Sequence, residues 1–495
     1  MFELTFLGHQ GWLLSTATTN LLIDPLLGDH FGHGGLLGDL YPPRTLDLAR
    51  FPPIDAVILS HEHDDHFDLP SLNRLDRRIP IYLSSRSSSA ARGLLDEMGF
   101  ARVNLLAPDD ELEIGELRYR SFVAEHDGAK QGDEWDVFPF LVRDRGGHGS
   151  LWSSVDVRPR DADLAQLRAL APRPGVWAYA NNCSRASFQT MSRSRAPDDL
   201  PASDSDDTPL LAAAVARRHA QLEASWGRPV ATLICGAGWS FPGPRAWMNH
   251  HLFPVDSQRL AASLANTCAD RAVAPHPGHT LVLRDGELIA ERSQRPFIQP
   301  RPRATWPARD HRGAGPQLVD YRPACGRTPI TAAERELLLD ELVDFARYLY
   351  GTPLFCQLHS LPTSLAADAG GEVRAQLCLS LRCDDGPLVL RYEPHACRFE
   401  VCAEGLRPTS FASGLECWAS DLLGFLRGEL GASALCYAGR LRVWNHAPKL
   451  LRVSPRELWM YGSPLRRPER AARLYRRLLA AEADPVPRVP ARESS

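Results

Sequence analysis

The sequence predicts an α/β fold for the N-terminal part of the chain and an α+β fold for the C-terminal part. Three observations carry this prediction. Short apolar runs alternate with polar turns and helical patterns over the first part, a proline-rich stretch interrupts them at residues 296–329, and new helix and strand signals follow. The length of 495 residues also exceeds what one hydrophobic core usually covers, so we expect two domains.

The N-terminal apolar runs at residues 4–7, 21–23, 56–59 and 81–83 are typical of short strands buried on both faces. Residues 87–98 instead repeat apolar side chains at helical spacing. Alternation of the two patterns predicts a layered α/β domain over residues 1–295. Within it, the polar residues 191–207 predict a mobile surface loop, and a helix is expected at 209–226.

Beyond the proline-rich linker, Thr331 and Glu334 have the spacing of a capping box, and the helix they start is expected to end at Gly351. Asp384-Asp385-Gly386 separates two strand-like runs and predicts a hairpin. We therefore expect an α+β accessory domain at residues 330–485 and a disordered tail at 486–495. A basic, solvated face is expected on the last helix, from Arg466, Arg467, Arg470, Arg473, Arg476 and Arg477.

The composition is that of an ordinary soluble globular protein, with 44% hydrophobic residues, 23% charged residues and a net charge of −4. This balance argues against nucleic acid as a partner. We expect no membrane segment and a cytoplasmic location, because the start lacks a signal-peptide pattern and no apolar run could span a bilayer. The eleven cysteines contain no C-x-x-C pair, which predicts reduced thiols and excludes a Rieske-type iron–sulfur centre.

The strongest functional signal follows the apolar run at residues 56–59. His61, His63, Asp65 and His66 arrive within six positions of one loop. Imidazole and carboxylate are ligands that divalent metal ions accept, and histidines two positions apart on an extended loop can converge on one ion. Asp65 and His66 then indicate a second ion beside the first. Ionisable residues spaced this closely beside a buried strand contribute nothing to a hydrophobic core, so we expect them to form a metal site.

The segment Ser60-His61-Glu62-His63-Asp64-Asp65-His66 resembles the signature of the metallo-β-lactamase superfamily. The runs Leu7-Gly8-His9-Gln10-Gly11 and Leu22-Ile23-Asp24-Pro25 are similar to the ascorbate-lactonase-like branch, which includes CMP-sialic acid hydroxylases. The resemblance implies a four-layer αββα sandwich and two divalent metal ions, zinc first, with iron or manganese as alternatives.

The same resemblance implies the remaining ligands. His126 would complete the first ion with His61 and His63, and Asp156 would bridge both ions, with Asp144 and Asp161 as rivals. His276, with His279 as its alternative, would complete the second ion with Asp65 and His66. Asp65 and His63 are the expected catalytic residues, since the counterpart of Asp65 orients the nucleophile in relatives.

Substrate contacts are expected from a glycine- and aromatic-rich stretch and from one early arginine, with packed loops and surface turns as the alternatives; the candidates are Trp239, Asn249, His279 and Arg44. Residues 421–430 and 438–443 resemble the helix-then-strand portion of sterol-carrier-like domains. That likeness implies an apolar groove, and the alternatives are a structural cap or a unit that forms a homodimer.

The expected function is a metal-dependent hydrolase, in which activated water attacks an ester, lactone, amide or phosphodiester of a small molecule. The alternative is a dinuclear-iron oxygenase on the same ligands, which would need a separate reductase. A third possibility is a binding protein that kept the fold without catalysis, against which the full ligand set argues.

Overall fold

The structure is a computed structural model of the whole chain, and it describes residues 1–32, 36–125, 134–181, 208–249, 253, 255–265, 271–309, 322–326, 329–403, 406–483, 485 and 487–493. The loop predicted at residues 191–207 lies outside these ranges. Below, the N-terminal part means residues 1–309 and the C-terminal part means residues 322–493.

The first sheet has eight strands, in the order β21-β20-β1-β2-β3-β7-β8-β9. Its members are β1 (Phe2–Gly8), β2 (Gly11–Ser15), β3 (Asn20–Ile23), β7 (Ala56–Leu59), β8 (Ile81–Ser84), β9 (Val103–Leu106), β20 (Thr280–Arg284) and β21 (Glu287–Arg292). The four strands from β3 to β9 run parallel. Along β7, Val57 packs into the core on one face and Ile58 into the core on the other, which confirms that this short run is buried on both faces.

The second sheet has seven strands, in the order β10-β11-β13-β14-β16-β17-β19. Its members are β10 (Glu111–Ile114), β11 (Leu117–Ser121), β13 (Phe140–Asp144), β14 (Ser150–Ser153), β16 (Val176–Ala180), β17 (Ala231–Cys235) and β19 (Ala272–Val273). Apolar side chains of both sheets form one shared core between them. The two sheets are therefore packed face to face.

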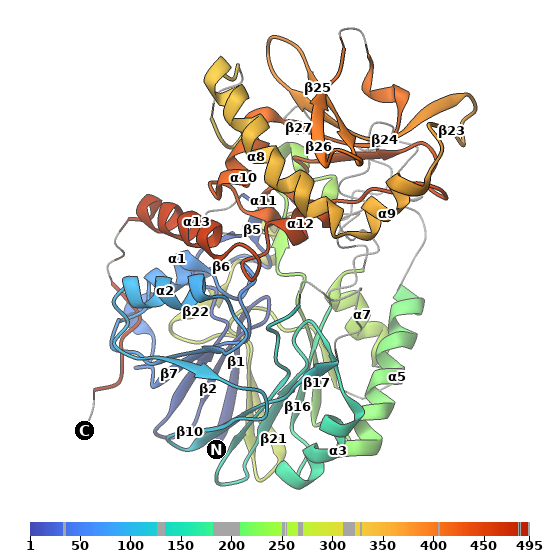
Figure 1. Cartoon of the computed structure of the whole chain (residues 1–495). Coiled ribbons are helices and arrows are strands. Elements are labelled where there is room, and N and C mark those ends of the chain that lie inside the picture. The colour runs from blue at the N-terminus through green and yellow to red at the C-terminus, as the bar shows by residue number, and fades with distance from the viewer. Residues whose placement is uncertain are drawn as a thin grey trace.

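Helices cover the outer face of each sheet (Figure 1). One layer holds α1 (Leu69–Asn73), α2 (Ser89–Glu97) and α13 (Pro468–Ala481), and the other holds α3 (Asp161–Leu170), α5 (Thr208–Trp226) and α7 (Ser257–Leu264). This arrangement confirms the predicted four-layer αββα sandwich. Among the described helices, none is long and apolar enough to cross a membrane.

Three small pairings tie loops to the sandwich near its upper edge. β18 (Trp239–Ser240), β5 (Gly38–Leu40) and β4 (His30–Phe31) form a three-stranded sheet, β6 (Arg44–Leu46) pairs with β22 (Ile298–Pro300), and β12 (Ala124–Glu125) pairs with β15 (Arg158–Pro159). The first of these brings the ring of Trp239 against Phe31, with 4.5 Å between the ring centroids. An aromatic wall is thereby built from residues far apart in the sequence.

The C-terminal part has its own sheet and core, as the α+β prediction requires. The sheet order is β26-β25-β24-β27-β28, and β23 also pairs with β24. Its elements are α8 (Ala332–Tyr350), α9 (Pro353–Ser360), β23 (Ser364–Ala366), β24 (Glu372–Arg382), β25 (Leu388–Glu393), β26 (Arg398–Val401), β27 (Phe411–Trp418), α10 (Ala419–Arg427), α11 (Ala432–Cys436), β28 (Arg442–Asn445) and α12 (Arg456–Tyr461). The capping box of Thr331 and Glu334 is confirmed, and β24 and β25 pair antiparallel around the predicted hairpin turn.

Helix α13 leaves the C-terminal core and joins the outer helix layer of the N-terminal part (Figure 1). The Tyr475 hydroxyl donates a 2.7 Å hydrogen bond to Glu62 Oε1, and the Tyr475 ring lies 5.5 Å from that of Phe67. On the surface, Arg476 Nε donates to Glu97 Oε2 over 2.8 Å. The two parts of the chain are therefore joined by a buried contact directly beside the metal-binding loop.

The end of the chain differs from two sequence expectations. Arg470 was expected on a solvated face, but its side chain is only 13% exposed and pairs with Glu341 at 3.1 Å. Within the predicted disordered tail, Val489 and Ala491 are buried and form bridges to Leu75 and Ile54. Each of these tail residues has an apolar neighbour supplied by a segment more than 400 positions earlier, which local composition does not reveal.

We predict that Tyr475→Phe destabilises the protein by about 1–3 kcal/mol, because the buried Glu62 carboxylate loses a hydrogen-bond donor. The measurement is the midpoint of thermal unfolding, with Tyr350→Phe as the control because Tyr350 is 62% exposed. Equal midpoints for the two variants would show that this contact does not hold the two parts together.

Candidate metal centre

The loop after β7 gathers four candidate ligands because it turns sharply back on itself. The backbone N–H groups of His66 and Phe67 both donate to the carbonyl of His63, at 3.0 and 2.7 Å. Asp68 then caps α1 by accepting a 3.0 Å bond from the Ser71 N–H. The turn places alternate side chains of residues 61–66 on one side, at the end of the parallel strands where such sites form.

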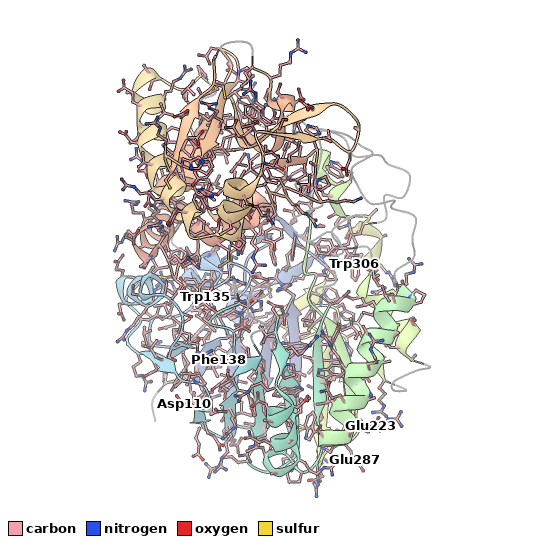
Figure 2. All side chains as sticks on the ribbon, turned by 45° about the vertical axis from the view of Figure 1, so that its right-hand side comes forward. Asp110, Trp135, Phe138, Glu223, Glu287 and Trp306 are labelled. Atoms are coloured by element: carbon pink, nitrogen blue, oxygen red, sulfur yellow. The ribbon has the colours of Figure 1, made fainter. Side chains whose placement is uncertain are left out.

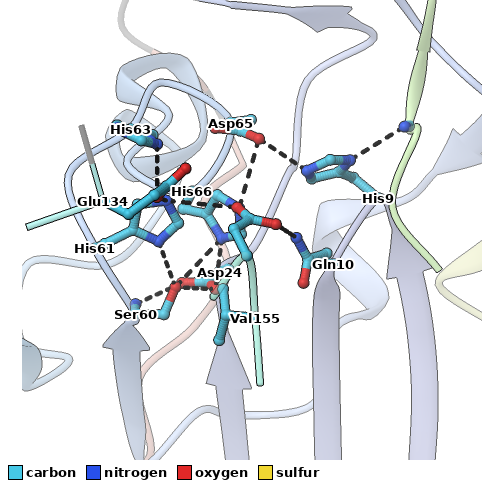
Figure 3. Close-up of polar contacts among 12 residues, drawn as sticks. His9, Gln10, Asp24, Ser60, His61, His63, Asp65, His66, Glu134 and Val155 are labelled. Atoms are coloured by element: carbon cyan, nitrogen blue, oxygen red, sulfur yellow. Dashed lines mark hydrogen bonds and ion pairs between the residues drawn. The ribbon is translucent and has the colours of Figure 1, made fainter. Parts of the chain in front are cut away.

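Three groups of side chains could each hold a cation, since their ligand atoms lie within 4.8 Å of one another. They are His61, His63 and Asp65; His61, His66 and Asp156; and His9, Asp65 and His66. Shared members link these groups, so the arrangement fits two neighbouring ions rather than one. Figure 3 shows the rings and carboxylates converging above the ends of the strands.

Asp156 enters from the second sheet, on the loop after β14. Its Oδ2 lies 3.2 Å from His66 Nε2 and 3.7 Å from His61 Nε2. Its Oδ1 accepts a 2.7 Å hydrogen bond from Gln10 Nε2, which fixes the carboxylate. Asp156 is therefore oriented between the two histidines, at the position expected of a bridging ligand.

Asp24 sets the orientation of two of the imidazoles from below. Its carboxylate accepts 2.7 Å hydrogen bonds from Ser60 Oγ and from His66 Nδ1. Ser60 Oγ, whose hydrogen goes to Asp24, in turn lies 2.9 Å from His61 Nδ1 and can accept its hydrogen. When both rings are neutral, as metal binding requires, their lone pairs lie on Nε2 of His61 and His66, the atoms that face the proposed ions.

The Nε2 atoms of His61 and His66 also provide a test of fit for metal ions. Among the residues that the structure describes, both are buried and have no hydrogen-bond partner. Buried polar atoms in proteins are almost always satisfied, so two buried ring nitrogens without a hydrogen bond on one surface need an explanation. A pair of divalent cations supplies it, and the donor set of imidazole and carboxylate suits zinc, iron or manganese.

Local charge also favours cations. Burial, with His66 and His63 nearby, holds the pKa of His61 well below its usual value, so the ring is neutral and keeps its lone pair. Burial opposes the charged form of His66, but Asp65 and Asp24 outweigh it and raise its pKa well above the usual value. A site negative enough to hold a proton on a buried ring also attracts a metal ion.

Glu134 is a candidate ligand that the sequence analysis missed. Its Oε2 lies 3.5 Å from His63 Nδ1 and 3.9 Å from His61 Nε2. It lies on an irregular segment before β13, and the residues around it in the sequence show no spacing typical of metal ligands. His126, which was expected to complete the first ion, lies outside the described residues.

His276 and the two rival aspartates lie away from the described ligand groups. The His276 ring stacks on His279, with 5.5 Å between centroids, and its Nδ1 lies 3.3 Å from the Pro277 carbonyl. Asp144 accepts from the Gly149 N–H, and Asp161 accepts from Gln221. His9, which was singled out only as part of a family-like strand, stands in the group instead, with its Nε2 2.9 Å from Asp65 Oδ2.

Of the expected substrate contacts, the structure places Trp239 alone beside the metal centre. Arg44 is fully buried, and its guanidinium donates to the carbonyls of Leu7, Leu26 and Gly28. Asn249 binds both backbone groups of Phe241, at 2.7 and 3.0 Å, and so holds a loop in shape. His279 pairs with Glu291 at 3.3 Å. These three side chains are occupied by structural contacts.

A cavity opens above the ligands, and the C-terminal part forms its roof. Ser433, Tyr437 and Trp459 line it together with aromatic residues of the N-terminal part, which are Phe31, Trp239 and Phe253. Ser433 Oγ donates to Asp64 Oδ2, and the Trp459 ring lies 6.0 Å from that of His63. A second cavity between the two parts shares His63, Asp64, Ser433 and Trp459 with the first, and includes Trp135, which Figure 2 labels near the level where the parts meet.

We predict that Asp24→Asn weakens metal retention by about 10-fold to 100-fold, because the amide cannot accept from both Ser60 and His66 as a carboxylate does. Metal content after dialysis against a graded series of chelator concentrations measures the effect. Asp96→Asn is the matched control, since Asp96 is exposed on α2. Equal retention in both variants would remove Asp24 from the metal centre.

Comparisons with known proteins agree with this geometry. Residues 19–169 match the family model described as the beta-lactamase superfamily domain. An uncharacterized protein of Mycobacterium tuberculosis is 34% identical over 70 residues, which are 14% of this chain and 18% of that protein. The cytidine monophosphate-N-acetylneuraminic acid hydroxylase of Mus musculus is 31% identical over 107 residues, which are 21% of this chain and 18% of that enzyme.

Among solved structures, an isothiocyanate hydrolase from Delia radicum gut bacteria is 16% identical, with a TM-score of 0.40 over 57% of this chain and 99% of that one. The chain thus matches less than a fifth of the length of the two curated relatives named above. The two packed sheets with their helix layers and the ligand loop after β7 agree with the family model that residues 19–169 match, and the N-terminal part of the chain has the metallo-β-lactamase fold.

Proposed function

We propose that the chain is a dinuclear iron oxygenase that hydroxylates a small molecule. The observation that carries the proposal is the position of Glu134 beside His61 and His63, at 3.9 and 3.5 Å. Two imidazoles and one carboxylate on a shared ion are the ligand set typical of non-haem iron oxygenases, whereas catalytic zinc sites of this kind often take a third imidazole.

The second ion position supports the same choice. Its described ligand candidates are His66, Asp65, the shared Asp156 and, on distance alone, His9. Apart from His9, whose two ring nitrogens are both engaged in hydrogen bonds, the candidates among the described residues are three imidazoles and three carboxylates: His61, His63 and His66, with Asp65, Glu134 and Asp156. Hard oxygen ligands in this proportion favour iron, whereas a site made mainly of imidazoles would equally suit zinc.

Iron ions held there would supply the reductive activation of dioxygen. The balanced reaction inserts one oxygen atom into a C–H bond of the substrate and releases the other as water, with two electrons and two protons consumed. We propose that a separate reductase delivers the electrons, because the chain has no C-x-x-C pair that would suit a Rieske-type centre of its own.

The protein's own residues would orient and shield this chemistry. Asp24, through Ser60, fixes the rings of His61 and His66, and Gln10 fixes Asp156. The aromatic walls and the roof of Tyr437 and Trp459 would exclude water around the substrate. The likeness to a mouse hydroxylase over 107 residues agrees with the proposal.

A zinc- or manganese-dependent hydrolase is the second candidate. The position of Asp156 Oδ2 between His61 and His66 favours it, because a bridging carboxylate equally suits two ions that activate water. Its substrate would be an ester, lactone, amide or phosphodiester. Elemental analysis of the protein purified without added metal separates the two candidates, with iron expected for the oxygenase and zinc or manganese for the hydrolase.

We predict that Glu134→His changes metal preference from iron toward zinc and abolishes reductant-dependent dioxygen uptake, because the first position then offers three imidazoles. The measurements are the iron-to-zinc ratio in protein grown with both metals and the rate of dioxygen consumption with a chemical reductant. Glu287→His, at an exposed position of β21, is the control. The oxygenase proposal fails if native protein holds zinc without iron and consumes no dioxygen.

A further inference from the structure

His9 occupies a strained position at the turn between β1 and β2. Its φ is 54° and that of Gly8 is 127°, and a left-handed backbone is uncommon for a residue with a side chain. The His9 carbonyl accepts a 2.8 Å hydrogen bond from the Gly236 N–H, which holds the turn against the second sheet. Strain maintained by surrounding contacts is a reason to look for a function at this residue.

The hydrogen bonds of the His9 ring decide which nitrogen carries the hydrogen. The Gly238 N–H donates to Nδ1 over 3.1 Å, so Nδ1 must offer a lone pair. Only glycine fits at position 238, since a Cβ there would lie 2.3 Å from the Cβ of His9. In the neutral ring the hydrogen is therefore on Nε2, which lies 2.9 Å from Asp65 Oδ2.

We infer that His9 is a fixed hydrogen-bond donor that positions Asp65, and that it is not a ligand of the second metal ion. The distances alone allow ligation, because His9, Asp65 and His66 form one of the three candidate groups. A neutral imidazole that ligates through Nε2 needs its hydrogen on Nδ1, where the Gly238 N–H already points. The inference rests on the proposed metal centre but not on the reaction assigned to it.

The surroundings of His9 suit a positioning residue. The ring meets Phe31 edge-on, with 5.2 Å between centroids, and lies 6.2 Å from the ring of Trp239. It is only 2% exposed, so its direction is set by packing as well as by hydrogen bonds. Asp65 Oδ2 also lies 3.5 Å from His66 Nε2, so the bond from His9 fixes the carboxylate against the second ion position. Hydrogen bonds of this kind to ligating groups commonly change metal affinity by about 10-fold to 100-fold.

The direct test is imidazole ¹⁵N NMR on protein loaded with zinc, which is diamagnetic and fills the site whatever the native metal. We expect a hydrogen on Nε2 and a lone pair on Nδ1 of His9. A metal-bound Nε2 with the hydrogen on Nδ1 would overturn the inference. Comparison with His9→Gln assigns the His9 signals.

A pair of variants provides a second readout. His9→Gln keeps a donor near Nε2 and should bind the second zinc ion with nearly native affinity. His9→Asn tolerates the left-handed backbone and can still accept from Gly238, but it cannot reach Asp65, so the second ion should bind about 10-fold to 100-fold more weakly. If His9→Gln instead loses the second ion as completely as Asp65→Ala does, His9 is a ligand.

Zinc titration followed by calorimetry gives these affinities, and circular dichroism checks that each variant is folded. The outcomes are separate from those of the proposed function. A protein that binds two zinc ions but shows no oxygenase activity with iron leaves the role of His9 standing, whereas a native protein that binds no pair of ions overturns both.

Discussion

The buried carboxylate of Asp24 is the contact on which the site depends. It is 2% exposed and accepts three hydrogen bonds, from the Ser60 N–H, from Ser60 Oγ and from His66 Nδ1. A buried charge is costly unless it is paired, and these donors satisfy it at the point where the ligand loop leaves β7. Asp24 thereby couples the fold of the first sheet to the direction of two imidazoles, because the bonds that stabilise the carboxylate are the ones that orient the rings.

The C-terminal part belongs to the same physical unit as the metal centre. It closes the cavity with Tyr437 and Trp459, and it binds the ligand loop through Ser433 and Tyr475, which contact Asp64 and Glu62. These two acidic residues alternate with the ligand positions along the loop. One side of the loop therefore carries the candidate ligands and the other is fixed by the C-terminal part, so the contacts that join the two parts also hold the loop in shape.

The sequence predicts the features that depend on a few consecutive residues, and it misses those that depend on contacts between distant parts of the chain. Three features each depend on a few consecutive residues, and the structure has all of them: the buried strand β7, the histidine-rich loop after it and the capping box of α8. Glu134 reaches the site from about 70 positions after the loop, and the burial of Val489 depends on its bridge to Leu75, much earlier in the chain. The sequence suggested Arg44 as a substrate contact because it does not show the three backbone carbonyls that bind the guanidinium in the folded chain.

His9 and His276 show how sheet order, rather than motif likeness, decides which imidazole meets the ions. His276 follows β19, the edge strand of the second sheet, whereas His9 follows β1, near the middle of the first sheet and two strands from β3. The cavity is consequently closed on this side by a ring whose lone pair faces Gly238 and not the metal. Without a further imidazole from His9 or His276, carboxylates carry as much of the described coordination as histidines, and this balance is the physical reason to favour iron over zinc.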